Sequence, residues 1–384
     1  MLEITAILAF VVWLYLLAGR GGFWLAGERD DRPEPPAPPA WPTIVAVIPA
    51  RNEAGSIGQT IRSLLSQDYL GRLEAIVVDD ASQDGTAAIA INAAEAAGAG
   101  ERLTVLSGRP LPPGWTGKLW AVKQGVEAAA ARRPKYLLLT DADIVYGPGT
   151  LKRLVARAER QGTVLTSIMV RLRYQSFAER LMIPAFVFFF QMLYPFAWVN
   201  RAQRATAAAA GGCMLVDAGA LAASGGIESI RSALIDDCAL ARQMKAVGPI
   251  WLGLSQHVAS IRAYDGFAPI RRMVTRSAYA ELNYSPLRLA GTVLGMALTF
   301  LAGPLLAIFG AGPAALLGAA TLGLMAVAYQ PALRLYRLSP LWGLALPAIA
   351  LLYTLWTVES ALQYARGRGG QWKGRVQAAA RGAR

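Results

Sequence analysis

Three short apolar runs mark the first part of the chain, at residues 43–48, 73–78 and 136–139. Each run is bounded by turn-forming residues, which is typical of buried β-strands. The segment after the first run places Ile57 and Ile61 at helical spacing, and the other intervening segments also have helical character. Strands alternating with helices predict an α/β domain with a mostly parallel sheet.

Acidic and polar residues follow each of these runs. The clusters occupy residues 49–53, 79–86 and 140–143. Because ligands of such sheets collect beyond the carboxyl ends of the strands, these side chains are expected to line one site. Carboxylates in that position suit a metal-bound, phosphate-bearing ligand, so we expect an enzyme that uses a nucleotide-activated donor.

Composition adds a membrane component. Of the 384 residues, 54% are hydrophobic and only 16% are charged, which fits one domain plus several membrane spans. The net charge of +13 comes from basic residues that flank apolar segments, so we expect contact with anionic lipid and no nucleic-acid partner. Two cysteines and one histidine exclude a disulfide framework, a structural zinc site and a histidine metal cluster.

The beginning of the chain predicts an anchor and a spacer. Residues 1–20 contain a nearly continuous apolar stretch that predicts a transmembrane anchor. A cleaved signal peptide is the alternative, but the start lacks positive charges and a prompt cleavage site. Residues 30–42 are proline-rich and predict a stiff linker to a catalytic domain at 43–285.

The end of the chain carries three further apolar segments within residues 286–363, followed by a basic tail at 364–384. We expect a multi-pass protein of a bacterial-type inner membrane, with the catalytic domain facing the cytoplasm. Three spans would place the tail outside, whereas its basic residues favour the inside. A re-entrant or interfacial position for one of the three segments is the alternative, and Pro347 and Glu359 make the last segment the weakest span. The topology stays open.

The apolar stretch at 181–200 differs from the others. Pro184 and Pro195 are expected to break a helix, and Gln191 is polar. Two short helices in the membrane interface are one interpretation, and a buried core element is the other.

Two acidic motifs are candidates for ligand binding. Asp141 and Asp143 flank Ala142, and in an extended segment residues two apart point the same way, so both could face one Mg²⁺ or Mn²⁺ ion. Asp79 and Asp80 form an adjacent like-charged pair, which needs water, a cation or donors such as those of a ribose or nucleobase. Asp84 is expected to cap the following helix.

Three other motifs each have a structural and a functional interpretation. The segment from Arg51 to Glu53 either caps a helix or binds ligand. Lys118, which follows Gly117 near a helix start, could neutralise a diphosphate. Asp236 and Asp237 open a predicted helix, where acids complement the helix dipole or supply a general base.

The order of these motifs resembles the family 2 glycosyltransferases, which have a GT-A fold with a Rossmann-like sheet. The resemblance covers residues 43–280 and includes the Gly-Gly-Cys motif at 211–213. The run Gly-Trp-Thr-Gly-Lys-Leu-Trp-Ala at 114–121 and the segment 372–375 also resemble the hopene-associated glycosyltransferases (HpnB type).

The resemblance implies a role for each matching residue. Those implied to bind the donor nucleotide and its diphosphate are Pro49, Arg51, Glu53, Asp79, Asp80, Lys118, Asp141 and Arg276. The implied metal ligands are Asp141 and Asp143, with Mg²⁺ or Mn²⁺ as cofactor. Asp237 matches the proposed catalytic base, with Asp236 beside it, and residues 211–213 match the floor of the acceptor site.

One departure from the family pattern is informative. Processive members carry Gln/Arg-x-x-Arg-Trp after the catalytic domain, whereas residues 273–277 here keep Arg276 and lack the Trp. This favours a single sugar transfer. The resemblance and the membrane segments together imply an inverting enzyme that uses a nucleoside-diphosphate sugar and a hydroxylated lipid acceptor of the hopanoid class. The alternatives are a nucleotidyltransferase of similar fold and a non-enzymatic membrane scaffold. The sequence leaves the oligomeric state open.

Overall fold

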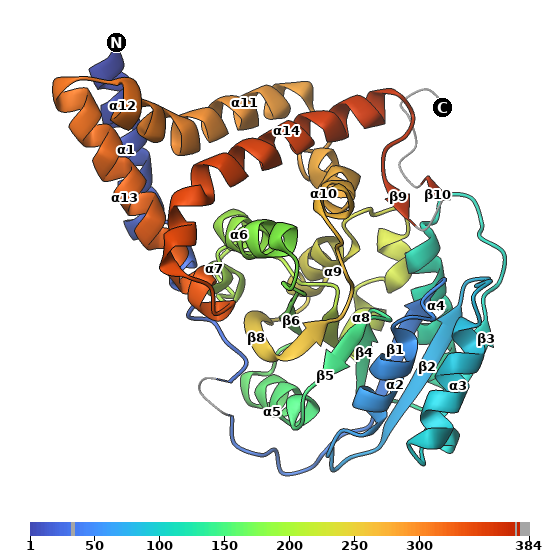
Figure 1. The fold of residues 1–384 in the computed structure, drawn as a ribbon. Helices are drawn as coiled ribbons and strands as arrows, with labels where there is room; N and C mark the ends of the chain where they lie inside the picture. Colours follow the sequence, from blue (N-terminus) through green and yellow to red (C-terminus); the bar gives the residue numbers. More distant parts are fainter. Residues whose placement is uncertain (32–34, 373–374, 377–384) are drawn as a thin grey trace.

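The computed structural model describes residues 1–31, 35–372 and 375–376. A mixed α/β domain carries helices on both faces of one sheet, and a layer of apolar helices lies along one side of it (Figure 1). Residues 32–34 of the predicted linker, together with 373–374 and 377–384 of the predicted tail, lie outside the described residues.

The central sheet has eight strands in the order β3-β2-β1-β4-β7-β6-β8-β5. Strands β3, β2, β1 and β4 are parallel, while β7 runs antiparallel to β4 and β6. Strand β8 is parallel to β6, and β5 pairs antiparallel with β8. The strands are β1 Ile44–Ala50, β2 Leu73–Asp79, β3 Leu103–Ser107, β4 Tyr136–Thr140, β5 Ile144–Tyr146, β6 Leu165–Arg171, β7 Cys213–Asp217 and β8 Ile250–Ser260.

The three strands expected from the apolar runs are therefore confirmed as β1, β2 and β4. Strand β1 pairs in parallel with both of the others. These strands are buried on both faces, which explains their continuous apolar sequence. Alternate residues of β1 enter two cores: Ile44 and Ile48 pack with helices on one face, and Val45 and Val47 pack on the other.

The helices of the catalytic domain connect these strands. They are α2 Ile57–Leu65, α3 Thr86–Ala96, α4 Gly117–Ala130, α5 Thr150–Gln161, α6 Phe177–Leu193, α7 Phe196–Val199, α8 Ala218–Ala223, α9 Asp236–Lys245 and α10 Phe267–Glu281, with short 3₁₀ turns η2 Gly100–Arg102 and η3 Ile227–Ile230. Gly85, and not Asp84, occupies the N-cap position of α3, and Asp84 accepts a hydrogen bond from the Thr86 backbone N–H from the position before it.

Helix α6 differs from the sequence-based expectation. It continues through Pro184 without a break, and the chain turns only at Pro195, where α7 begins. The side chains of Met182, Ile183 and Phe188 are fully buried, so packing outweighs the local cost of a proline inside the helix. The helix lies between the catalytic domain and the outer apolar helices (Figure 1).

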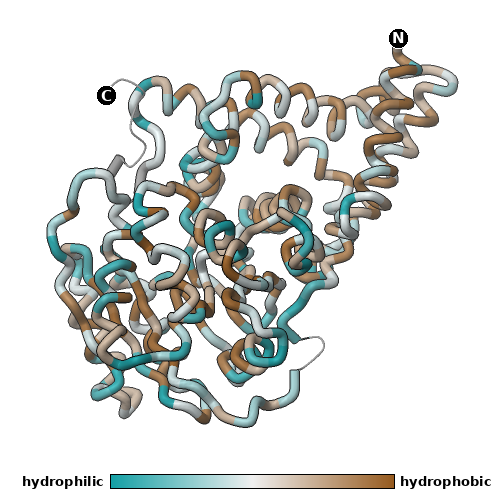
Figure 2. Tube along the Cα trace, turned by 180° about the vertical axis from the view of Figure 1, so that it is seen from behind, coloured by the Kyte–Doolittle hydropathy of each residue, from teal (hydrophilic) through white to brown (hydrophobic). Residues whose placement is uncertain are grey.

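The apolar layer consists of helices from both ends of the chain. They are α1 Leu2–Ala18 with the 3₁₀ turn η1 Phe23–Leu25, α11 Pro286–Met296, the π-helical turn η4 Ala297–Ala302, α12 Gly303–Phe309, α13 Gly312–Leu335, the 3₁₀ turn η5 Pro340–Ala345 and α14 Leu346–Ala365. Two short strands, β9 Gln371–Trp372 and β10 Arg375–Val376, follow. Hydrophobic residues, drawn in brown in Figure 2, dominate these helices.

Four helical segments are long and apolar enough to cross a membrane. These segments, found within the described part of the chain, are Phe177–Val199, Pro286–Phe309, Gly312–Leu335 and Pro340–Ala365. Helix α1 is apolar but has only 17 residues, so its span is about 25 Å at the usual rise of an α-helix. The helices predicted within 286–363 are thus present, and membrane association follows from their composition.

Candidate functional site

The candidate site lies where β1 and β4 end and where α4 and α9 begin. An open cavity of about 1320 Å³ extends from this edge toward the apolar helices. Most of the residues singled out from the sequence line it: Pro49, Glu53, Lys118, Asp141, Asp143, Asp236, Asp237 and Arg276. The fold therefore brings together side chains from distant parts of the sequence.

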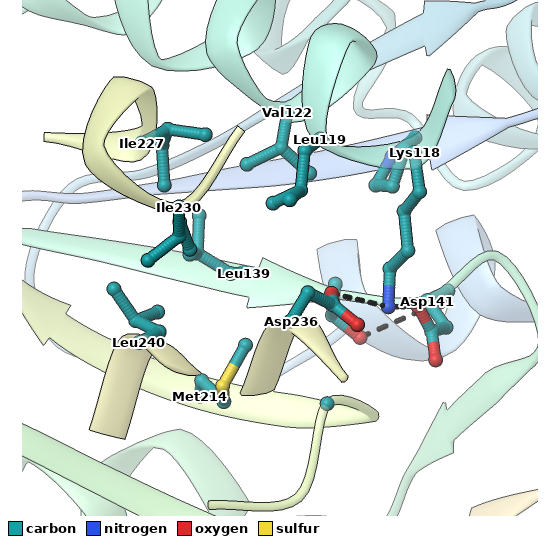
Figure 3. A pocket seen from close by; sticks show the side chains of 13 residues that line it. Lys118, Leu119, Val122, Leu139, Asp141, Met214, Ile227, Ile230, Asp236 and Leu240 are labelled. Atoms are coloured by element: carbon teal, nitrogen blue, oxygen red, sulfur yellow. Dashed lines mark hydrogen bonds and ion pairs between the residues drawn. The ribbon is translucent and has the colours of Figure 1, made fainter. Parts of the chain in front are cut away.

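Lys118 holds two of the carboxylates together. Its Nζ lies 2.9 Å from Asp141 Oδ1 and 3.0 Å from Asp236 Oδ2 (Figure 3). Thr116 caps α4 by accepting from the Leu119 N–H, which fixes Lys118 in the first helical turn. Burial disfavours the ammonium ion, but the charges of Asp141 and Asp236 outweigh it and raise the pKa of Lys118 above its ordinary value.

Arg262 forms a second clamp that the sequence did not reveal. Its Nε lies 2.8 Å from Asp143 Oδ2 and its Nη2 lies 2.8 Å from Glu53 Oε1. Ser260 Oγ also donates to Asp143 Oδ2 at 2.9 Å. Arg262 follows the end of β8, and the pairing of β5 with β8 places it beside Asp143. The charges of Asp143 and Glu53 raise the pKa of Arg262 against the effect of burial.

Asp237 is held differently from its neighbour. Its Oδ2 accepts from the Gly211 backbone N–H at 2.9 Å, and its Oδ1 accepts from the Cys238 N–H at 2.7 Å. Among the described residues, no Lys or Arg nitrogen lies within ion-pair distance of this carboxylate. Burial, followed by the nearby charge of Asp236, raises the pKa of Asp237 to about 6.

Asp141 and Asp143 were expected in an extended segment, but the chain turns between them. Asp141 follows β4 directly, whereas Ala142 and Asp143 form a turn that leads into β5. Both side chains still line the cavity. Burial raises the pKa of Asp141, Lys118 opposes this effect, and the charge of Asp143 adds to it, so the two carboxylates interact electrostatically.

These two carboxylates fit a hard divalent cation, because carboxylate oxygens are the ligands that Mg²⁺ and Mn²⁺ prefer. Within the ranges that the structure describes, no group of three or more His, Cys, Asp or Glu side chains forms a complete metal cage. A site of this kind needs further oxygen ligands from a phosphate-bearing substrate.

Arg51, Asp79 and Asp80 lie at the neighbouring strand ends rather than among the cavity-lining residues. Arg51 Nη1 donates to the Asp80 carbonyl at 2.5 Å and lies 3.6 Å from its carboxylate. Asp79 Oδ1 accepts from the Ser82 N–H at 2.9 Å, which stabilises the turn after β2. All three residues thus make contacts within the protein, at the edge of the sheet where a nucleotide was expected to bind.

The far half of the cavity combines apolar and polar walls. Phe186, Phe189 and Phe190 of α6 contribute aromatic surface, together with residues of α10 and α14. The Tyr194 hydroxyl donates to the Glu281 carboxylate in a short hydrogen bond at the cavity wall. This half can accommodate a molecule with a substantial apolar part.

Two other residues, Cys238 and His257, form hydrogen bonds within the surrounding backbone. Cys238 is buried and its thiol contacts the Ala209 carbonyl. His257 is exposed on β8, and its backbone carbonyl accepts from the Gly147 N–H.

Comparison with known proteins finds relatives of the α/β domain. The family model described as "Glycosyl transferase family 2" matches residues 45–223. An N-acetylglucosaminyltransferase of Mesorhizobium japonicum is 28% identical over 153 residues, which cover 38% of this chain and 34% of the relative. The chain therefore matches about a third of the length of that curated relative.

The fold has a counterpart among solved structures. A mannosyltransferase from Pyrobaculum calidifontis, in complex with GDP-mannose and Mn²⁺, superposes with a TM-score of 0.55 at 19% identity. The similarity covers 94% of this chain and 98% of that structure, so it includes the apolar helices as well as the sheet. Residues 45–223 of this chain are therefore similar to the family 2 glycosyltransferases, and the chain shares its overall fold with the mannosyltransferase structure.

Proposed function

We propose that this protein is a membrane-bound, inverting glycosyltransferase that moves one sugar from a nucleoside-diphosphate sugar to a hydroxylated lipid. The observation that carries the proposal is the position of Asp237 in the cavity. The carboxylate lines the same cavity as the two charged clamps and the apolar side chains of α6 and α14. One cavity can thus admit a phosphate-bearing donor and an apolar acceptor.

The donor is proposed to bind over the strand ends. Pro49, Arg51, Glu53, Asp79 and Asp80 would contact the nucleotide, which the family resemblance implies for these positions. Lys118 and Arg276, both at the cavity, would offset the charge of the diphosphate.

The metal site is proposed at Asp141 and Asp143. A Mg²⁺ or Mn²⁺ ion held by these two carboxylates would supply charge stabilisation for the departing diphosphate. Lys118 pairs with Asp141 and Arg262 pairs with Asp143 in the structure.

Asp237 is proposed as the general base. Its carboxylate takes the proton from the acceptor hydroxyl while that oxygen forms a bond to the anomeric carbon. The bond between the anomeric carbon and the diphosphate oxygen breaks, its electron pair leaves with the nucleoside diphosphate, and the anomeric configuration inverts. A carboxyl pKa of about 6 lies close to neutral pH, where a general base is most effective.

The acceptor is proposed to be a lipid with a free hydroxyl, of the hopanoid class. The aromatic side chains of α6 and the helices around them offer an apolar surface that continues from the cavity to candidate membrane spans. Transfer of a single sugar is favoured because residues 273–277 lack the tryptophan of processive enzymes. The bacterial inner membrane, with the domain in the cytoplasm, is the proposed location.

The test is donor hydrolysis by purified protein in detergent. Nucleoside-diphosphate sugars are screened with Mn²⁺ or Mg²⁺, with and without membrane lipid extract, and the released nucleotide is identified. We expect metal-dependent release of a nucleoside diphosphate from one donor, stimulated by lipid and lost in Asp141→Ala. Release of pyrophosphate from nucleoside triphosphates would indicate the alternative nucleotidyltransferase. Absence of metal-dependent nucleotide binding would instead favour a scaffold.

A further inference from the structure

Helix α14 is long and apolar enough to cross a membrane, yet both of its ends contact the catalytic domain. Near its beginning, the ring of Trp342 in η5 lies 5.7 Å from Phe177 at the start of α6. Near its end, Arg271 of α10 lies 3.0 Å from Glu359. Figure 1 shows α14 running from the end of α13, past α6, to α10.

The middle of the same helix is attached to the domain as well. The Tyr353 hydroxyl donates to the Met182 carbonyl of α6 at 2.9 Å, and its ring packs on Phe189. One turn beyond Trp356, Ser360 Oγ donates to the Thr275 carbonyl of α10 at 2.6 Å. Contacts along the whole length show that α14 lies flat on the α6–α10 face.

Helices α6 and α10 are themselves tied to one side of the membrane. Strand β6 leads into α6, and the chain returns after α7 to β7, which pairs with β6 in the same sheet. A single crossing by Phe177–Val199 is therefore excluded, because it would place two paired strands on opposite sides. Helix α10 follows β8 of that sheet directly. Both ends of α14 thus belong to the side of the catalytic domain.

The remaining apolar helices have a different geometry, with one end near the domain and one end away from it. At the distant end, Ala6 of α1, Leu306 of α12 and Ala314 of α13 pack together. At the near end, Arg20 donates to the Met192 carbonyl, and Tyr336 packs against Tyr174 of the domain. Helix α11 begins just after Tyr284, whose ring stacks on Tyr364 in the last turn of α14.

The exposed surface of α14 is apolar and one-sided. Its outward residues recur at three- and four-residue spacing, which aligns them on one helical face. They are Leu341, Leu344, Ala348, Leu351, Leu355 and Leu362. The opposite face is buried against α6, α10 and the neighbouring apolar helices. Exposed arginines lie beyond both ends, at Arg337 before the helix and at Arg366 and Arg368 after it.

We infer that η5 and α14 form an in-plane membrane-binding surface on the catalytic-domain side, and that only α1, α11–α12 and α13 cross the bilayer. The leucine face enters the acyl region of the leaflet, and the flanking arginines meet anionic headgroups. This arrangement places Arg366 and Arg368 on the same side as the catalytic domain, which removes the conflict between three C-terminal spans and a basic tail.

Cysteine accessibility tests the topology. The native Cys213 and Cys238 are both buried, so the unchanged protein is the background control. Single exposed cysteines are introduced by Glu101→Cys in the domain, Ser339→Cys before α14, Arg368→Cys after it and Ala311→Cys between α12 and α13. Sealed vesicles are then treated with a membrane-impermeant maleimide.

We expect the first three variants to react from one side and Ala311→Cys from the other. Reaction of Arg368→Cys from the side opposite to Ser339→Cys would mean that α14 crosses and would overturn the inference. Reaction of Ala311→Cys from the same side as Glu101→Cys would overturn the assignment of the crossing helices. Neither result depends on glycosyltransferase activity.

Depth measurements give a second, independent test. An environment-sensitive fluorophore is attached to Leu344→Cys, Leu351→Cys and Leu362→Cys, and its quenching by nitroxide lipids of graded depth is measured. An in-plane helix gives similar depths at all three positions, whereas a crossing helix gives a progression. Leu316→Cys and Val327→Cys on α13 are the matched control, because they should differ in depth by about 16 Å along the helix axis.

Discussion

Neighbouring carboxylates of the cavity are held in two different ways. Asp141, Asp143, Asp236 and Glu53 are each paired with Lys118 or Arg262. Asp237, next to Asp236 at the start of α9, is buried and accepts hydrogen bonds from backbone N–H groups, and its pKa rises to about 6. The paired carboxylates suit a cationic ligand, whereas the environment of Asp237 suits a carboxylate that must accept a proton.

The largest expected effect comes from Asp237→Asn. The amide cannot take a proton, so sugar transfer should fall by about 10²- to 10⁴-fold, while nucleotide binding stays close to that of the unchanged protein. Transfer is measured with radiolabelled donor, and binding by calorimetry. Asp265→Asn is the control, because Asp265 is a highly exposed acid on the loop before α10. Retained turnover in Asp237→Asn would remove the assignment of the base.

The next effect concerns the clamp that was found only in the structure. Arg262→Gln should raise the donor KM by about 10- to 100-fold and change kcat less, since hydrogen bonds to charged groups contribute roughly 1.5–3 kcal/mol. Arg262→Lys should recover part of the loss, because an ammonium ion can still pair with one of its two carboxylates. Arg29→Gln, which removes a surface pair with Asp31, is the control. An unchanged KM would show that this clamp has no role in donor binding.

Arg262 also illustrates what local sequence can and cannot predict. The apolar runs predicted β1, β2 and β4 because buried parallel strands need continuous hydrophobic sequence. The first-turn position of Asp236 and Asp237 followed from the helical spacing after them. Arg262 reaches its partner only through strand pairing, and the neighbouring contact between Ser260 and Asp143 joins residues 117 positions apart.

The helical layer shows the same limit. Apolar composition correctly predicted helices within 286–363, but it could not separate helices that cross a membrane from one that lies on a protein surface. Likewise, a helix break was predicted at Pro184 because a proline removes one backbone hydrogen bond from a helix. Tertiary packing around Met182 and Phe188 stabilises α6 in spite of that loss.

A smaller effect is expected in the pH dependence. Because the pKa of Asp237 is about 6 in the free protein, kcat/KM should be high above that pH and fall as the pH decreases through it. The Asp236 charge contributes to the raised pKa, so Asp236→Asn should move the acidic limb to lower pH. Asp237 stays buried in this variant, so its pKa should fall only part of the way toward the ordinary value of an aspartate. An unmoved limb would show that another group controls it.

The smallest effect separates two buried tyrosines of the helical layer. Tyr353 donates its hydroxyl to the Met182 carbonyl, so Tyr353→Phe should lower the free energy of unfolding by about 1 kcal/mol. The buried Tyr329 hydroxyl has no hydrogen-bond partner among the described residues, so Tyr329→Phe should be neutral or stabilising. Both variants keep their ring, and thermal unfolding in detergent compares them directly. Equal destabilisation would mean that the hydroxyl contact between α14 and α6 contributes nothing specific, and that packing alone holds α14 on the domain.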